Sequence, residues 1–413
     1  MEFSAAERQL LHADGAVTRE DLRAWEEEFG RVVERIGPLF YRTDSRAHGE
    51  RYLRGLLAPL ARKNGWTIAE HAGQKEPKAL QRFLNLTPWD ADELRDIVVA
   101  YAMEHFADQR GVLIADPTGF AKKGKKSAGV QRQYSGTLGR IDNCQIGTFL
   151  SYVSRGGDRV LIDRELYIPE ESWFGDRVRC AEAGIPEEAE FATRPQQVKE
   201  MIGRVRAAGV PFAWFTADEE FGQNPGLREY LENEGIAYVM AVPKNTVLTD
   251  ARGRETAVSK IPAGLKPAAW QRRACGIGTK GFRVYDWALA NSADPDHQYM
   301  IRRSIDDGEL AYYHCYNPRH ESFSELVRTA GSRWPVEECF GAAKNETGLD
   351  NYQVRLYHAW YRHITLSMLA LTFLAVIRHD AKKGSRNLWT TCGAPGDGHP
   401  ARGQITQAEP AGR

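Results

Sequence analysis

The spacing of apolar residues changes abruptly near residue 111, and this change limits the folds that the chain can adopt. Before it, "HGERYLRGLLAPLARKNG" places Leu53, Leu56 and Leu60 at the spacing of three and four that marks one face of a helix. After it, "GVLIAD" is a short continuous apolar run, which is typical of a strand buried on both faces. The sequence therefore predicts a helical region over residues 1–110, followed by a sheet.

Beyond residue 111, further strand patterns alternate with helical ones. The expected order is strand, strand, strand, helix, strand, helix, strand, over residues 111–116, 143–154, 159–168, 195–209, 210–218, 225–235 and 236–242. Neighbouring strands followed by right-handed crossover units give a mixed sheet covered by helices. The expected fold class is therefore α/β.

Residues 246–325 interrupt this rhythm. "RVYDWALANS", "HQYMIRRSI" and "LAYYHCYNP" have strand composition with turn residues between them, so we expect a β-rich insertion. Helical patterns return over residues 326–380, as a second part of the domain that begins at 111–245. The last residues, 381–413, are rich in Gly, Pro and polar residues and are predicted to be disordered.

The positions of charged, cysteine and apolar residues along the chain indicate more about the class of protein than their total numbers do. The chain has 55 basic and 55 acidic residues, so its net charge gives no indication of a nucleic acid partner, whereas clusters of like charge do. Its six cysteines are scattered without CxxC spacing, which argues against a zinc site and a disulfide framework. The longest apolar run, "ITLSMLALTFLAVI", is short for a bilayer, so we expect a cytoplasmic protein with no membrane partner.

A helix-turn-helix outline lies within the helical region. In "TIAEHAGQKEPKALQRFLNL" a capping box from Thr67 to Glu70 predicts one helix start, Gly73 a turn, and Pro77 a second start. The second helix would present side chains that could read DNA, namely Lys78, Gln81, Arg82 and Asn85. Because any helical hairpin has this outline, plain structural packing remains the alternative.

Two of the expected strands end in an aspartate. Asp116 follows "VLIA" and Asp218 follows "WFTA". In an open α/β sheet, ligands bind beyond the carboxyl ends of the strands, so acids delivered there by adjacent strands can converge. Two neighbouring carboxylates repel, and a hard divalent cation removes that repulsion. A turn or helix-cap role remains the alternative for each aspartate taken alone.

A third acid is expected on the helix that contains "SRWPVEECFGAAKNETG". Arg333, Glu337 and Lys344 are spaced so that they share one helix face, which would point a carboxylate and two cations into the same crevice. Three acids complete a site for two Mg²⁺ ions about 3.5 to 4 Å apart, the arrangement that cleaves phosphodiesters. Glu338 lies about 100° from Glu337 around the helix and ranks second; the other rival acids are Glu219, Glu220 and Glu346.

A cationic loop follows the first of these acids. Lys122, Lys123, Lys125 and Lys126 come within ten residues of Asp116. They would provide one side of an electrostatic cradle for a polyanion, although a solvated turn is the alternative. Arg355, Arg362 and His363 flank an apolar helix and are candidates for either DNA contact or packing. Trp270 is a candidate for stacking on a displaced base, with core packing the alternative.

Taken together, these stretches resemble the DDE transposases of bacterial insertion sequences, and most of all the insertion-sequence 701 family. The likeness is carried by "DPTGFAKKGKKSAGVQRQYSGTLGRIDNCQIGTFLSY", "DRELYIP", "TADEEFGQNPGLREYLENEGIAYVMAVP" and "RWPVEECFGAAKNETGLDNYQVR", and extends from about Arg51 to about Ile377. Related families carry a Tyr-x2-Arg-x3-Glu-x6-Lys signature, and the Tyr position is Ala330 here. The resemblance implies a ribonuclease H-like catalytic domain, interrupted by the insertion over residues 246–325 and preceded by a helical DNA-binding domain over residues 1–110.

The resemblance also implies an activity. It assigns Asp116, Asp218 and Glu337 as catalytic acids and ligands of two Mg²⁺ ions, with Mn²⁺ able to substitute. The expected activity is that of an endonuclease and strand transferase, which binds terminal inverted repeats, cleaves DNA strands and joins them to target DNA. The expected partners are double-stranded DNA of the transposon ends and the target, and a second copy of the chain on DNA. The alternative is a transposase-derived DNA-binding protein without cleavage activity.

The DNA contacts predicted from the sequence fall in three groups. The lysines after Asp116 and the two cations beside Glu337 would hold phosphates, and two cations of the second short helix would contact the duplex. These residues are Lys122, Lys123, Lys125, Lys126, Arg333, Lys344, Lys78 and Arg82.

Overall fold

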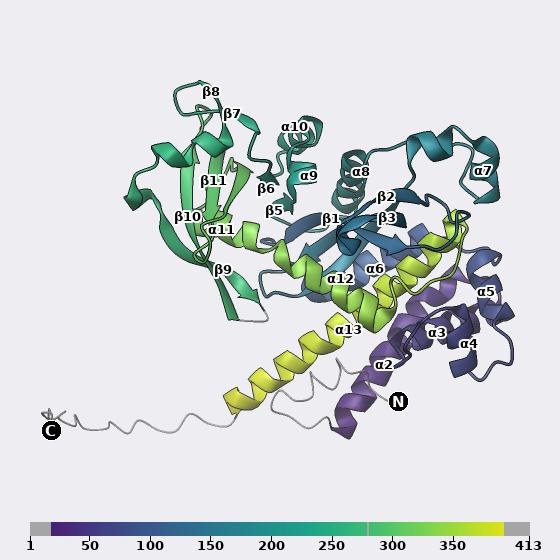
Figure 1. Cartoon of the computed structure of the whole chain (residues 1–413). Coiled ribbons are helices and arrows are strands. Elements are labelled where there is room, and N and C mark those ends of the chain that lie inside the picture. The colour runs from purple at the N-terminus through teal and green to yellow at the C-terminus, as the bar shows by residue number, and fades with distance from the viewer. Residues whose placement is uncertain (1–17, 279–280, 392–413) are drawn as a thin grey trace, which may run out of the picture.

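The computed structural model describes residues 18–278 and 281–391, and begins with a set of helices (Figure 1). These are α2 (Arg19–Ile36), α3 (Thr43–Leu57), α4 (Gly65–His71), α5 (Lys78–Asn85) and α6 (Ala91–Phe106). Thr18 caps α2 in a reciprocal capping box with Asp21. The expected helical character of the N-terminal region is confirmed for the residues that the structure describes.

The two short helices of the predicted helix-turn-helix are present as α4 and α5. The predicted start at Thr67 is wrong, because Asn64 is the cap: its side chain accepts from the backbone of Trp66 and Thr67. Thr67 returns the bond to the backbone of Asn64. The sequence offered two possible caps, and the earlier one adds a turn to the helix.

A ten-stranded mixed sheet follows, with a separate two-stranded sheet beside it. The strands of the large sheet are β1 (Val112–Ala121), β2 (Gln131–Ser135), β3 (Arg140–Val153), β4 (Arg159–Tyr167), β5 (Trp214–Ala217), β6 (Tyr238–Val242), β9 (Gln271–Gly278), β10 (Gly281–Asn291), β11 (His297–Arg303) and β12 (Leu310–Tyr316). The small sheet pairs β7 (Val247–Thr249) with β8 (Glu255–Ala257). The spatial order of the large sheet is β2-β3-β1-β5-β6-β12-β11-β10-β9, with β4 paired to β3.

Strand β1 is longer than the sequence suggested, and Asp116 does not end it. β1 pairs antiparallel with β3 as far as Ala121, whereas its parallel pairing with β5 stops at Ala115. The turn composition of "PTG" was misleading here, because Gly119 lets another segment approach: a Cβ built there would lie 2.0 Å from the hydroxyl of Ser135. Strand β2, which lies between β1 and β3 in the chain and pairs with β3, was not predicted from the sequence.

The β-rich block over residues 246–325 extends the same sheet. Strand β12 pairs antiparallel with β6, and β11, β10 and β9 follow it outward. In Figure 1 these strands form the left side of the molecule, continuous with the central strands. The block therefore shares a sheet with the strands that carry the two aspartates.

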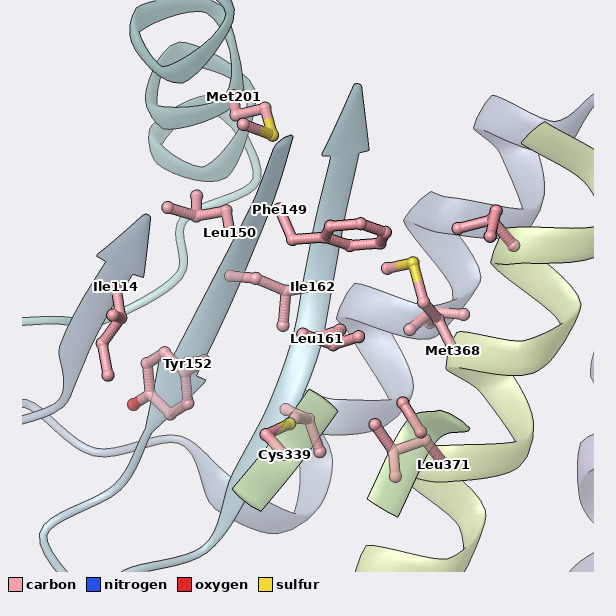
Figure 2. Close-up of a cluster of buried hydrophobic side chains, with 14 of the residues drawn as sticks. Ile114, Phe149, Leu150, Tyr152, Leu161, Ile162, Met201, Cys339, Met368 and Leu371 are labelled. Atoms are coloured by element: carbon pink, nitrogen blue, oxygen red, sulfur yellow. The ribbon is translucent and has the colours of Figure 1, made fainter. Parts of the chain in front are cut away.

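Helices cover both faces of the central strands. The remaining helices are α7 (Arg177–Glu182), α8 (Arg194–Ala207), α9 (Glu219–Gly222), α10 (Pro225–Asn233), α11 (Phe323–Gly331), α12 (Trp334–Thr347) and α13 (Tyr357–Thr391). Short helical turns lie at Gly37–Leu39, Gly136–Leu138, Glu170–Phe174, Val258–Lys260, Pro262–Gly264 and Pro267–Ala269. Figure 2 shows the core between these layers, with Met201 of α8 on one side of the strands and Met368 of α13 on the other.

Helix α13 runs past the predicted boundary at residue 380. The helix continues to Thr391, and its extension begins with Ala381, Lys382 and Lys383, which are good helix formers. The structure therefore differs from the prediction of disorder over residues 381–391. Residues 392–413 lie outside the described residues. The segment Tyr357–Ala381 is long and apolar enough to cross a membrane, with a mean hydropathy of 1.4, but 67% of that apolar window is buried inside the protein. We therefore interpret it as a core helix.

The central strands confirm the predicted fold class. Antiparallel β1, β3 and β4 are followed by β5 and β6, which run parallel to β1, in the spatial order β4-β3-β1-β5-β6. This order, with helices on both faces, is the arrangement of a ribonuclease H-like sheet. Strand β5 ends beside a continuing β1, and the carboxyl ends of strands in an open α/β sheet are where ligands bind.

Candidate active site

The first two acids leave the sheet side by side. Ala115 of β1 and Ala217 of β5 are paired in register, and Asp116 and Asp218 are the next residues of these parallel strands. Asp218 is also the N-cap of α9, where its Oδ1 accepts from the backbone of Glu220 at 3.0 Å. The alternative cap role is thus observed for Asp218, and it engages one of the two carboxylate oxygens.

Asp116 lies in an environment that disfavours its charge. Its side chain is 16% exposed, and burial is the main cause that raises its pKa to about 7. The negative charges of Asp218 and Glu337 contribute to this rise in the pKa, and the guanidinium of Arg333 opposes it. Asp218 and Glu337 are therefore close enough to act electrostatically on Asp116.

Helix α12 lies across β1 and brings the third acid to this edge. At its start, Arg333 Nη1 is 3.9 Å from Asp116 Oδ1, and near its end Lys344 Nζ donates to Thr118 Oγ1 at 2.8 Å. Glu337 lies between the two cations on the same face of the helix. Its side chain is exposed, since it lies in the first turn at the open edge.

The rival acids have other partners. Glu338 pairs with Arg159 at 2.6 Å, which directs it away from Asp116. Glu220 pairs with Arg194 at 2.7 Å, although its charge still contributes to the raised pKa of Asp116. Because Glu338 already pairs with a cation, Glu337 remains the predicted third acid.

The donor set fits a hard divalent cation. Carboxylate oxygens are the ligands that Mg²⁺ prefers, and a cation beside Asp116 would stabilise a charge that burial and two neighbouring acids disfavour. Over residues 18–278 and 281–391, however, no three Asp, Glu, His or Cys side chains are arranged as ligands of one ion. The assignment of Asp116, Asp218 and Glu337 as metal ligands thus remains a prediction.

The lysines after β1 are not beside the acids. Because β1 continues past Asp116, Lys122 lies six residues farther along an extended strand, which is about 20 Å. Lys123, Lys125 and Lys126 are exposed. The Lys122 amine instead lies 3.4 Å from the centre of the Tyr352 ring, and burial lowers the pKa of Lys122 to about 7.

The other candidate DNA contacts divide into exposed and buried groups. Lys78 and Arg82 are exposed on α5, and Arg355 is exposed before α13. Arg362 is buried and donates to the carbonyl of Trp89. These contacts favour packing for Arg362, whereas Arg355 remains available to a ligand.

The contacts of His363 and Trp270 bear on whether these residues contact DNA or pack inside the protein. His363 is fully buried between the hydroxyl of Tyr52 and the carbonyl of Gly348, so it packs inside the protein. Trp270 is half-buried, and the Arg303 guanidinium lies 4.1 Å from the centre of its ring. This cation occupies a face that a displaced base would need.

Sequence reasoning missed Thr118 and Arg194. Thr118 is two residues from Asp116, so it shares a face of β1, and that spacing was the available signal. Arg194 neutralises Glu220 near the site from the first turn of α8. Nothing in its local sequence indicates that pairing, because α8 and α9 meet only in the folded chain.

Comparisons with known proteins identify a family for the chain. A model of the DDE superfamily endonuclease family matches residues 35–288. A "probable transposase for insertion sequence element IS701" from Microchaete diplosiphon is 28% identical over 193 residues, which are 46% of this chain and 47% of the relative. The match thus spans about half the length of that relative.

Two solved structures share parts of the architecture. The piggyBac transposase synaptic complex with hairpin DNA aligns with 85% of this chain and 71% of its own, at a TM-score of 0.45 and 9% identity. Endonuclease V of Ciona intestinalis, in complex with a 23mer DNA, aligns with 60% of this chain and 97% of its own, at a TM-score of 0.27 and 8% identity.

Proposed function

We propose, from the premise that the chain belongs to the DDE superfamily endonuclease family, that it is a transposase which cleaves DNA strands at the ends of an insertion sequence and transfers them to target DNA. The observation that carries the proposal is that Asp116 and Asp218 follow paired residues of two adjacent parallel strands, at an edge where the charge of Glu337 also acts on Asp116. Sequence relationship to a probable insertion-sequence transposase supports it.

Each residue of the site has a role in this chemistry. Asp116, Asp218 and Glu337 would hold divalent cations, which when bound supply Lewis-acid stabilisation of charge at phosphorus. Arg333 reaches Asp116 from the same helix face as Glu337, so it can orient a phosphate over the acids. Lys344, which donates a hydrogen bond to Thr118, would provide a second cation for the backbone of the bound DNA strand. Both cleavage and strand transfer are in-line displacements at phosphorus, so one site serves both.

The partners follow from the reaction. The substrate is double-stranded DNA, first the terminal repeats of the element and then its target. Joining two ends requires two sites, so the active species on DNA would be a homodimer. The reaction would take place in the cytoplasm, on DNA of the nucleoid.

The test uses DNA that carries the sequences flanking the coding region. The purified chain is incubated with this DNA and Mg²⁺, beside Asp116→Asn, Glu337→Gln and, as a matched control, Glu338→Gln. We expect cleavage near the element's ends by the intact chain and by Glu338→Gln, with a loss of about a hundredfold or more in the other two variants. Binding is measured in parallel by fluorescence anisotropy.

The alternative is a transposase-derived protein that binds DNA without cutting it. It is favoured by one observation, that no three acidic, His or Cys side chains of the described residues are arranged around one ion. The same experiment decides, because specific binding by the intact chain without cleavage supports the alternative and overturns the proposed function.

A further inference from the structure

A cleft of about 1380 Å³ lies between the N-terminal helices and the loop that follows β1, distant from the three acids. We define residues 122–130 as the lysine loop. One wall of the cleft consists of residues 122–127 of this loop together with residues 350–356 before α13. The opposite wall includes Gln81 and Asn85 of α5. Trp173 and Arg179 also line the cleft, so four segments that are far apart in the sequence form it.

The cleft is strongly cationic. Its exposed basic side chains come from the lysine loop and from two segments around it, and are Lys123, Lys125, Lys126, Arg62 and Arg355. Two exposed acids, Glu182 and Asp350, also line it. In a chain with no net charge, this local excess of positive charge indicates a polyanionic ligand.

The lysine loop is held in one conformation by its backbone. Arg179 stacks 3.8 Å from the centre of the Trp173 ring and donates to the carbonyls of Lys125 and Val130. Asn143 donates to the carbonyls of Lys122 and Gly124. These bonds use backbone acceptors, which leaves the side chains of Lys123, Lys125 and Lys126 at the surface.

The turn after the lysines is equally restricted. Gly129 has a φ of +74°, and a Cβ there would lie 2.7 Å from the carbonyl oxygen of Tyr167. Ala128 is bonded on both sides, through its N–H to the carbonyl of Arg355 and through its carbonyl to the amide of Gln145. Because little ordering entropy remains to be lost, the loop is preorganised for binding.

Two elements lead from the candidate active site to this cleft. β1 carries Asp116 and ends where the lysine loop begins, about 20 Å away. α12 runs beside it from Arg333 to Lys344, about 16 Å, and continues into the residues before α13 that line the cleft. Arg333 and Lys344 therefore place positive charge between the three acids and the cleft.

We propose that this cleft binds a segment of the same DNA that is cleaved at the three acids, about six nucleotides from the cleavage position, an inference that rests on the proposed function. The separation follows from the distance of about 20 Å between Asp116 and the lysine loop, since successive phosphates of one strand are about 3.4 Å apart along the duplex. The lysine loop and Arg355 hold the backbone. Gln81 of α5 faces the same cleft and supplies an amide that can pair with a base edge.

The first experiment measures affinity for the flanking DNA by fluorescence anisotropy over a range of salt. The test variant combines Lys123→Gln, Lys125→Gln and Lys126→Gln, and the matched control combines Lys260→Gln and Lys266→Gln, two exposed lysines of the β-rich block. We expect the triple variant to bind at least about tenfold more weakly, with the log-log salt slope reduced by about 2 to 3, and the control to be unchanged. Circular dichroism checks that each variant is folded.

A second experiment tests the position. Duplexes are extended from about two to about ten base pairs on each side of the cleavage site. The triple variant should match the intact chain on the shortest duplexes and bind more weakly once an arm exceeds about six base pairs. A Gln81→Ala variant should lose discrimination between the flanking sequence and a scrambled duplex, with the salt slope retained.

The outcomes separate the two proposals. If the intact chain cleaves the DNA and the triple variant binds and cleaves equally well, the cleft assignment is overturned and the proposed function stands. If the intact chain does not cleave but its binding depends on the three lysines, the cleft is supported and the cleavage function is not. If the intact chain neither binds nor cleaves, both are overturned.

Discussion

The amine of Lys344 donates a 2.8 Å hydrogen bond to the hydroxyl of Thr118, and this contact joins the last turn of α12 to the strand that carries Asp116. Thr118 is 3% exposed and Lys344 is half-buried, so the bond is partly shielded from water. Arg333, at the other end of the helix, faces Asp116. The placement of Glu337 therefore depends on contacts at both ends of α12.

Replacing Lys344 by Met should separate activity from stability. Burial already lowers the pKa of the Lys344 amine, so its removal should change the free energy of unfolding by no more than about 1 kcal/mol. Cleavage should fall by about a hundredfold, because a cation near the phosphate is lost. Denaturant titration and cleavage rates check both. A Lys344→Met chain that cleaves as fast as the intact one would contradict the assignment.

Thr118→Val and Thr118→Ser form a matched pair for the same contact. Val leaves the amine of Lys344 without its acceptor in a buried position, which should cost about 1 to 3 kcal/mol and lower cleavage as well. Ser keeps the hydroxyl and should retain both properties. Equal behaviour of the two variants would show that the hydroxyl has no such role.

Asp218 combines a cap with a proposed ligand, and two substitutions separate these roles. Asn caps helices as well as Asp does, so Asp218→Asn should keep its bond to the Glu220 backbone and its stability. Asp218→Ala should lose about 1 kcal/mol of stability. Both should abolish cleavage, because both remove a carboxylate. Thermal unfolding and cleavage assays on the two variants check this. Cleavage by Asp218→Asn would show that Asp218 caps α9 but is not needed as a carboxylate ligand.

Arg179 should act as a positioning residue for the lysine loop. Its Nη2 donates to the carbonyls of Lys125 and Val130 and its Nη1 donates to the carbonyl of Ser172, a planar two-nitrogen arrangement that the single amine of Lys cannot reproduce. Arg179→Lys keeps the charge and should still weaken DNA binding by about tenfold, with amide hydrogen exchange accelerated over residues 122–130. Unchanged exchange in this loop would show that Arg179 does not order it.

The buried His363 should make stability depend on pH. Its Nε2–H donates to the carbonyl of Gly348 and its Nδ1 accepts from Tyr52, so the ring is neutral. Burial, assisted by the nearby charge of Lys122, lowers the pKa of His363 to about 4, and the bond to Gly348 opposes this effect. The unfolded chain takes up a proton first as pH falls, so stability present above about pH 6.5 should decline toward pH 4, by up to about 3 kcal/mol.

A substitution isolates this contribution. His314 is also buried and its pKa is lowered to about 3, so the intact chain carries a background from a second histidine. His363→Gln should be less stable than the intact chain at pH 7 but should show a shallower decline between pH 6.5 and 4. Denaturant titrations at several pH values measure the free energy of unfolding of both chains. An identical decline in the two chains would show that His363 does not cause the pH dependence.

Local sequence was sufficient for part of the site. Strand-like runs ended at Asp116 and Asp218 with the right order to place them on neighbouring strands, and the spacing of Arg333, Glu337 and Lys344 defined one helix face. These predictions depend only on the local spacing of residues within one strand or one helix, and that spacing is the same in the folded protein.

Tertiary context decided the rest. Pairing with β3 carries β1 through Pro117 and Gly119, a stretch with turn composition, so the lysines lie about 20 Å from the acids rather than beside them. Asp163 shows the same limit: it lies on a strand, yet it is 1% exposed and pairs with Arg204 of α8. Which partner covers a strand face is not encoded within the strand itself.

The central claim is that Asp116, Asp218 and Glu337 together bind divalent cations, and a Mn²⁺ titration followed by electron paramagnetic resonance tests it most directly. The exposed Glu337 side chain is free to turn toward the ion. With flanking DNA present, the intact chain and Glu338→Gln should bind Mn²⁺ with equal affinity, and Asp116→Asn and Glu337→Gln should bind it at least about tenfold more weakly. Equal Mn²⁺ binding by all four chains would contradict the account.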